Sequence, residues 1–92
     1  MLYHVRMDVH PPVDHRSVDF EQLKVEEKRI AQELQRDGKW LHLWRIAGHY
    51  ANVSIFDVAD HDELHRILTS LPLFPFMSID VTPLAQHPSS LR

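Results

Sequence analysis

The sequence predicts a single α+β domain whose strands and helices follow one another in the order β-α-β-β-α-β. Three observations lead to this prediction. Residues 2–9 and 40–58 carry the alternating apolar and polar residues of strands, whereas residues 17–36 and 60–71 repeat apolar residues at helical spacing. Proline or glycine separates most of these segments. A chain of 92 residues has room for one such domain, which we expect to span 1–92.

The first strand and the first helix are predicted from their ends as well as from their periodicity. A proline pair follows the strand at residues 2–9 and ends it, since proline cannot donate a hydrogen bond to a sheet. Residues 14–16 form a short connection. The helix is expected over residues 17–36, with Ser17 as its N-cap and Gly38 just beyond its last turn.

A β-hairpin follows the first helix. Two β-rich runs, residues 40–46 and 50–58, are separated by a short connection that contains Gly48, which is typical of a tight turn between antiparallel strands. Asp60 is then expected to cap the second helix, because Glu63 stands three residues later in capping-box position.

The last strand is predicted at residues 76–82, and Pro83 is expected to end it. From about residue 84 the chain is polar and contains a further proline. We expect this C-terminal tail to be extended and to become ordered through contact with another molecule.

The element order is the ferredoxin-like arrangement, in which two helices cover one face of a four-stranded antiparallel sheet. Strand alternation assigns to the helix-covered face Tyr3, Val5, Met7, Leu41, Leu43, Val53, Ile55, Met77, Ile79 and Val81. It assigns to the opposite face His4, Arg6, His42, Trp44, Tyr50, Asn52, Ser54, Phe56 and Ser78. Because this second set mixes aromatic with polar groups, we expect the sheet of another subunit to cover it, as in a dimeric α+β barrel.

The composition argues against several functional classes. A net charge of −3 with no basic run gives a nucleic-acid partner no electrostatic support. The chain contains no cysteine, which excludes thiol nucleophiles and thiolate metal sites and is compatible with a cytoplasmic location. No stretch approaches the roughly 20 apolar residues of a membrane span, and the charged N-terminus lacks a signal-peptide core.

Glu27 is the first candidate catalytic residue. Helical spacing places this glutamate in the middle of the apolar stripe formed by Phe20, Leu23, Ile30 and Leu34. A core-facing carboxylate has a raised pKa when it is desolvated, and such a group can take up and return a proton. The alternative is a helix rotated slightly, so that Glu27 forms an ion pair with a neighbouring lysine or with an arginine of the sheet.

Three candidate binding residues lie at and beside the hairpin. Arg45 falls on the helix-covered side at the end of its strand, where it can hold a substrate carboxylate or pair with Glu27 and keep that glutamate ionised. His49 and Tyr50 lie at the hairpin, where functional groups are common, although His49 can equally be a simple turn residue.

Metal and cofactor chemistry have little support in the sequence. His61 and His65 lie one helical turn apart, but the metalloprotease pattern requires glutamate directly after the first histidine, and Asp62 stands there. We therefore interpret both histidines as surface residues and predict no metal. The sequence has no Gly-rich phosphate loop, nucleophile elbow or dinucleotide fingerprint, so we predict no cofactor.

The stretch WLHLWRIAGHYANVSIFDV, residues 40–58, strongly resembles the muconolactone Δ-isomerase family. The resemblance continues in MLYHVRMDV, in LKVEEKRIAQELQRDGKW, in LPLFPFMSIDV and in the HPSS of the tail, and so covers nearly the whole chain. The sequence departs from the family pattern at Leu41, where a basic residue is expected, and in the segment from Asp14 to Phe20.

The resemblance implies a cytoplasmic, cofactor-independent isomerase of the catechol branch of the β-ketoadipate pathway of aromatic degradation. Such an enzyme converts muconolactone to 3-oxoadipate enol-lactone by moving one proton, and it assembles as a homodecamer built from dimers. One carboxylate suffices for this reaction, and Glu27 is the candidate. Arg45 is then the candidate for the substrate carboxylate, with Tyr50 or His49 for the dienolate oxygen. The alternatives are a chloromuconolactone dehalogenase and a non-catalytic ligand-binding barrel.

Overall fold

The computed structural model describes residues 1–13 and 19–92. In chain order the elements are β1 (Leu2–Val9), α1 (Phe20–Arg36), β2 (Trp40–Arg45), β3 (Ala51–Asp57), α2 (His61–Ser70), a 3-10 turn η1 (Phe74–Phe76) and β4 (Met77–Leu84). The predicted βαββαβ order is therefore confirmed.

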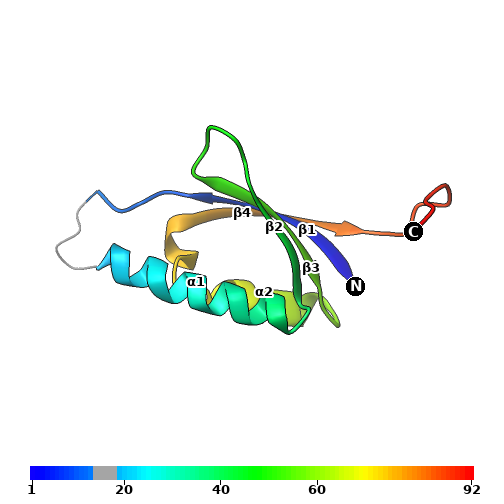
Figure 1. Ribbon diagram of the computed structural model, residues 1–92, viewed down its shortest axis with the longest axis horizontal. Helices are drawn as coiled ribbons and strands as arrows, with labels where there is room; N and C mark the ends of the chain where they lie inside the picture. The colour runs from blue at the N-terminus through cyan, green and yellow to red at the C-terminus, as the bar shows by residue number, and fades with distance from the viewer. Residues whose placement is uncertain (14–18) are drawn as a thin grey trace.

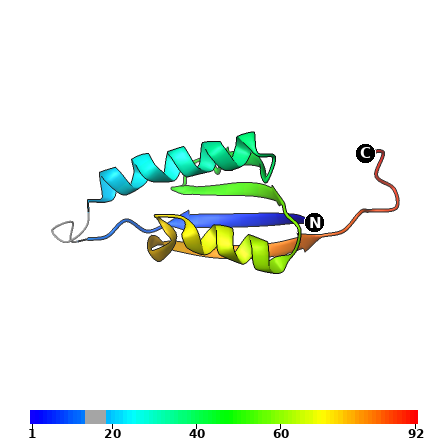
Figure 2. The same cartoon turned by 90° about the horizontal axis from the view of Figure 1, so that it is seen from below.

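The four strands form one antiparallel sheet in the order β2-β3-β1-β4. Figures 1 and 2 show both helices on the same side of this sheet, which leaves its other face open. α1 lies on the β2 side of the molecule and α2 on the β4 side. The chain beyond β4 is exposed and extends away from the sheet, with a turn in which the Ser90 N–H donates to the His87 carbonyl at 3.0 Å.

The helix ends are fixed by side-chain caps. Asp19 caps α1, because its carboxylate accepts from the backbone N–H of Gln22 at 3.1 Å. Ser17, the cap predicted from the sequence, lies outside the described residues, as does the predicted connection at 14–16. At α2 the predicted cap is confirmed, since Asp60 accepts from the N–H of Glu63 at 2.8 Å.

The prediction that Pro83 ends the last strand is wrong, because β4 continues to Leu84. Pro83 lies opposite Tyr3 within the ladder between β1 and β4. β4 is an edge strand of the sheet, and a strand edge that has no neighbour tolerates a residue without a backbone N–H.

The core lies between the helices and the inner face of the sheet. Tyr3, Val5 and Met7 of β1 are buried as predicted, and Met77 and Ile79 of β4 pack against them. The side chains of α2 that complete this core are Leu64 and Leu68, which confirms the predicted apolar stripe of the second helix.

The prediction for β3 is wrong, because its two faces are exchanged. Phe56 pairs with Tyr3, Ser54 with Val5 and Asn52 with Met7, so these β3 residues face the helices together with their β1 partners. Val53 and Ile55, which were assigned to the core, face the open side instead. Alternation alone could not decide which face of β3 meets the helices, because each face carries large apolar side chains. The pairing with β1 fixes this choice.

A β-bulge at Leu41 corrects the prediction for β2. The pairing to β3 shifts between Trp40 and His42, and Leu41 is the extra residue. Trp40 therefore joins the core at 2% exposure, while Leu41, predicted to face the helices, is 42% exposed. Beyond the bulge Leu43 pairs with Ser54, so this half of β2 returns to the inner face as predicted.

Candidate functional site

A cavity of about 420 Å³ lies between α1 and the end of the sheet that carries the β2–β3 hairpin. Its helix wall comes from α1, its sheet wall from β2 and β3, and its far side from the segment between α2 and β4. It is lined by Val9, Lys24, Glu27, Lys28, Ala31, Gln32, Gln35, Trp40, Leu43, Arg45, Tyr50, Ala51, Asn52, Leu73 and Met77. Three of the four predicted site residues thus share one cavity.

Glu27 lies half-buried on the helix wall of this cavity. Its Oε1 accepts from the backbone N–H of Leu73 at 3.0 Å. Leu73 precedes the 3-10 turn η1 as its N-cap, where the first backbone N–H groups have no partner inside the turn and are free to bind a carboxylate. A helix terminus from the other half of the molecule therefore orients one oxygen of Glu27.

None of the ion pairs among the described residues includes Glu27, which removes the alternative of an ion-paired glutamate. Lys24, one of its possible partners, instead binds Glu21 at 2.9 Å. Burial raises the pKa of the Glu27 carboxyl above its ordinary value, and the hydrogen bond from Leu73 opposes this effect in part. The cavity therefore contains a carboxyl group whose raised pKa suits it to taking up and returning a proton.

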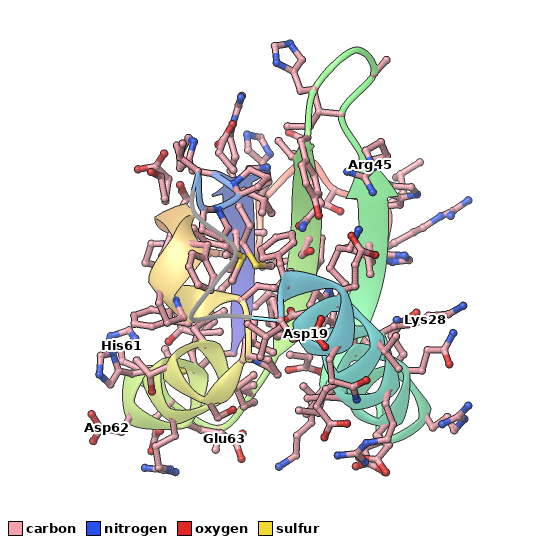
Figure 3. The ribbon with its side chains drawn as sticks, turned by 90° about the vertical axis from the view of Figure 1, so that its left-hand side faces the viewer. Asp19, Lys28, Arg45, His61, Asp62 and Glu63 are labelled. Atoms are coloured by element: carbon pink, nitrogen blue, oxygen red, sulfur yellow. The ribbon has the colours of Figure 1, made fainter. Side chains whose placement is uncertain are left out.

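Arg45 and Tyr50 lie together on the sheet wall. The guanidinium carbon of Arg45 lies 5.3 Å from the centre of the Tyr50 ring, within the range of a cation–π contact. Figure 3 shows Arg45 on β2, close to the hairpin, and Lys28 on the side of α1 that faces away from α2. Regular alternation had placed Arg45 and Tyr50 on opposite faces of the sheet. The exchanged faces of β3 bring them to the same side.

His49 does not belong to the cavity lining. It lies in the tight turn between β2 and β3, where its backbone N–H donates to the Ile46 carbonyl at 3.1 Å. Gly48, the preceding residue, has a φ of +82°. This backbone conformation favours glycine, which explains why glycine occupies that position of the turn.

Asn52 on β3 is a cavity residue that the sequence prediction missed, because that prediction assigned it to the open face. Its Oδ1 accepts from the hydroxyl of Ser54 at 2.8 Å, and Ser54 is fully buried at 0% exposure. The sequence does carry a signal for this position. The polar residues Asn52 and Ser54 stand two positions apart on the strand, and the core residue Phe56 follows two positions after Ser54. Residues at that spacing share a face.

The two histidines of α2 lie away from this cavity. His61 and His65 border an open groove with Tyr3 and Pro83, and the hydroxyl of Tyr3 hydrogen-bonds to Nδ1 of His61. Across the part of the chain that the structure describes, no three His, Cys, Asp or Glu side chains are grouped as metal ligands. No helix in those same residues is long and apolar enough to span a bilayer.

The fold and the cavity together define a class of protein. It is a small α+β protein in which one half-buried carboxyl group, a cation and an amide line the same cavity of ligand size. Such a site can move a proton within a small anionic molecule.

Comparisons with known proteins identify the family. The profile of the family described as Muconolactone delta-isomerase matches residues 1–90. The Muconolactone Delta-isomerase of Cupriavidus pinatubonensis is 59% identical over 92 residues, covering 100% of both chains. That of Rhodococcus opacus is 52% identical over 91 residues, covering 99% of this chain and 98% of its own. The chain belongs to the muconolactone Δ-isomerase family.

A solved structure supports the same conclusion. A crystal structure of muconolactone isomerase superimposes with a TM-score of 0.92 at 56% identity, covering 100% of this chain and 96% of that chain. The ferredoxin-like fold, the family resemblance and the prediction of an isomerase are therefore confirmed, and the alternatives of a dehalogenase and of a binding module are not favoured.

Proposed function

We propose that the protein converts muconolactone to 3-oxoadipate enol-lactone, with Glu27 as the group that carries the proton. The observation that supports this most directly is the half-buried Glu27, which has a raised pKa and no ion pair among the described residues. The family supplies a reaction that requires one such group, and the cavity has the size of a small ligand site.

The reaction shifts a carbon–carbon double bond within the lactone ring. Ionised Glu27 removes the proton from the ring carbon that bears the carboxymethyl group. The electron pair then delocalises through the double bond to the lactone carbonyl as a dienolate. The protonated Glu27 returns the proton to the carbon beside that carbonyl, so the carboxylate is regenerated and no atom is gained or lost. Because Leu73 holds Oε1, Oε2 is the oxygen that carries the proton in this proposal.

Arg45 is the proposed partner of the substrate carboxylate. The Tyr50 ring supports the guanidinium from one side, which leaves its N–H groups available to a carboxylate. Tyr50 also offers a hydroxyl at the outer end of the sheet wall, and we propose that this hydroxyl contacts the bound lactone. His49 lies outside the lining, so we assign it no contact with substrate in the cavity of its own chain.

We also propose that the protein is a single domain over 1–92 that assembles as a homodecamer built from dimers in the cytoplasm. The open face of the sheet supports an assembly, since it presents a stack of His42 and Trp44 with ring centroids 4.7 Å apart. Trp44 is 55% exposed there, more than a large aromatic side chain usually is. Native mass spectrometry should detect the decamer, and a monomer at micromolar concentration would contradict this part.

The catalytic proposal is tested with purified full-length protein and muconolactone. We expect ultraviolet absorbance to report loss of the conjugated lactone, and proton NMR in deuterated water to show the product double bond. A parallel sample contains the chlorinated lactone, with chloride release as the readout. Dehalogenation without isomerisation would replace the proposal with a dehalogenase, and lactone binding without turnover would replace it with a binding protein.

A further inference from the structure

Asn52 is held in a defined orientation on the sheet wall of the cavity. Its backbone pairs with Met7 on one side and with Arg45 on the other, which directs its side chain toward the helices. The Ser54 hydroxyl donates to Oδ1 at 2.8 Å, and Ser54 itself is fully buried. With its carbonyl oxygen occupied by Ser54, the side-chain amide presents its NH₂ group to the cavity.

We propose that Asn52 donates a hydrogen bond from Nδ2 to the lactone carbonyl oxygen as this oxygen takes up the dienolate charge. Ser54 is the positioning residue that fixes which end of the amide faces the substrate. This inference rests on the proposed isomerase reaction and adds to it an inner donor, beyond the hydroxyl of Tyr50.

The positions of three groups support this assignment. Glu27 belongs to the helix wall and Asn52 to the sheet wall, so a lactone bound between them can turn one face of its ring to the base and its carbonyl edge to the donor. In muconolactone the carbonyl carbon and the carbon bearing the carboxymethyl group both bond to the ring oxygen. Both polar groups therefore lie along one edge of the ring. Arg45 and Asn52 are directly paired on adjacent strands, where they can receive those two groups side by side.

Other donors in the lining are less suited to the carbonyl oxygen. The indole N–H of Trp40 has no hydrogen-bond partner among the described residues, but the nitrogen is fully buried and is not presented to a ligand. The amide of Gln35 donates to the Ala31 carbonyl of its own helix at 3.1 Å. A donor fixed before the reaction needs no reorganisation when charge develops, and the Ser54 contact gives Asn52 this property.

The test compares Asn52→Leu, Ser54→Ala and the double variant in the isomerase assay. Asn52→Leu should lower kcat about 100-fold with little change in KM, because the hydrogen bond strengthens only as charge develops. Ser54→Ala should lower kcat about tenfold through a misplaced amide. The double variant should be no slower than Asn52→Leu alone, since Ser54 acts only through Asn52.

Gln22→Leu is the control, because it removes an exposed side-chain amide of α1 that does not line the cavity. Its kcat should stay within about threefold of wild type. If Asn52→Leu does not fold, Asn52→Ala takes its place, with circular dichroism as the check. A kcat within threefold of wild type for the position-52 variant, an effect on KM alone, or additive losses in the double variant would overturn the inference. A wild-type protein that does not isomerise the lactone would overturn the proposed function itself, which separates the two failures.

Discussion

The outer and inner faces of α1 place chemically identical carboxylates in opposite settings. On the outer face Arg29 binds Glu26 through Nε at 3.0 Å and Glu33 through Nη1 at 3.0 Å. Arg29 lowers the pKa of the Glu26 carboxyl, mainly through the hydrogen bond. On the inner face Glu27 receives one backbone N–H and forms no ion pair with a described residue, and burial raises its pKa.

The difference teaches that the surroundings decide what an acidic residue can do. Glu26 and Glu27 are consecutive in the chain, so helix propensity and local sequence are nearly the same for both. One is stabilised in its charged form beside a cation and in water, where an ion pair contributes little. The other exchanges its proton more readily because the cavity removes it from water. Four predictions test this contrast.

The largest effect is expected for the two glutamates themselves. Glu27→Gln should lower kcat about 1,000-fold, within the range of general acid–base groups, because the amide cannot carry the proton. Glu26→Gln should leave kcat within about twofold of wild type, since exposed substitutions have small effects. The kcat of each variant is measured in the muconolactone assay, with samples that have the same oligomeric state as wild type. Comparable losses in the two variants would remove the distinction between the two faces.

The second prediction compares two arginines. Arg45→Met should raise KM for muconolactone about 10- to 100-fold, because a charge-assisted hydrogen bond to the substrate carboxylate is lost. Arg29→Met, on the outer face, should not change KM. The measurement is steady-state kinetics at low and high salt, since a charged contact weakens as salt rises. An unchanged KM in Arg45→Met would assign the carboxylate to another cation of the lining.

The third prediction concerns the pH dependence of kcat/KM. Ionised Glu27 is the active base and its pKa is raised, so the acid limb should have its midpoint above the ordinary glutamate value of 4.5. Replacing the Leu73 amide by an ester removes the N–H that favours the carboxylate, and it should move the midpoint higher still. The same replacement at Phe74, whose N–H donates to the Leu71 carbonyl, is the control and should leave the midpoint in place.

The smallest effect is expected in thermal stability. A carboxyl whose folded pKa is raised favours folding at acid pH and loses this contribution as pH rises through that pKa. Glu27→Gln should therefore melt above wild type at pH 7, and the difference should vanish below pH 4.5. Glu26 has a lowered pKa, so its contribution is present at neutral pH and is lost on acidification. Glu26→Gln should melt slightly below wild type at pH 7. If the melting temperatures of both variants shift in the same direction at pH 7, the contrast between the two glutamates is refuted.

Much of the fold could be predicted from the sequence because local chemistry determines it. Helical spacing placed Glu27 on the inner face of its helix, and the capping residues Asp60 and Glu63 marked the start of α2. The ends of β1 were predicted from alternation and a proline pair. In each case the residues that decide the structure lie within a few positions of one another.

The sheet wall of the site could not be predicted in the same way. β3 has apolar residues on both faces, so alternation does not show which side meets the helices. That choice depends on pairing with β1, a contact between segments about 50 positions apart in the chain. The same error hid Asn52 and separated Tyr50 from Arg45. Likewise, the hydrogen bond from Leu73 to Glu27 joins residues 46 positions apart, and no local pattern reports it.

The bulge in β2 affects how the chain can vary. Leu41 is the extra residue that separates the core half of the strand, at Trp40, from the cavity half, which ends at Arg45. Its side chain is substantially exposed, so many side chains are compatible with this position. The additional residue nevertheless bends and twists the strand between those halves. The presence of a residue at position 41 therefore matters more than its side chain, since deleting it would remove the bulge and shift one half of β2 against β3.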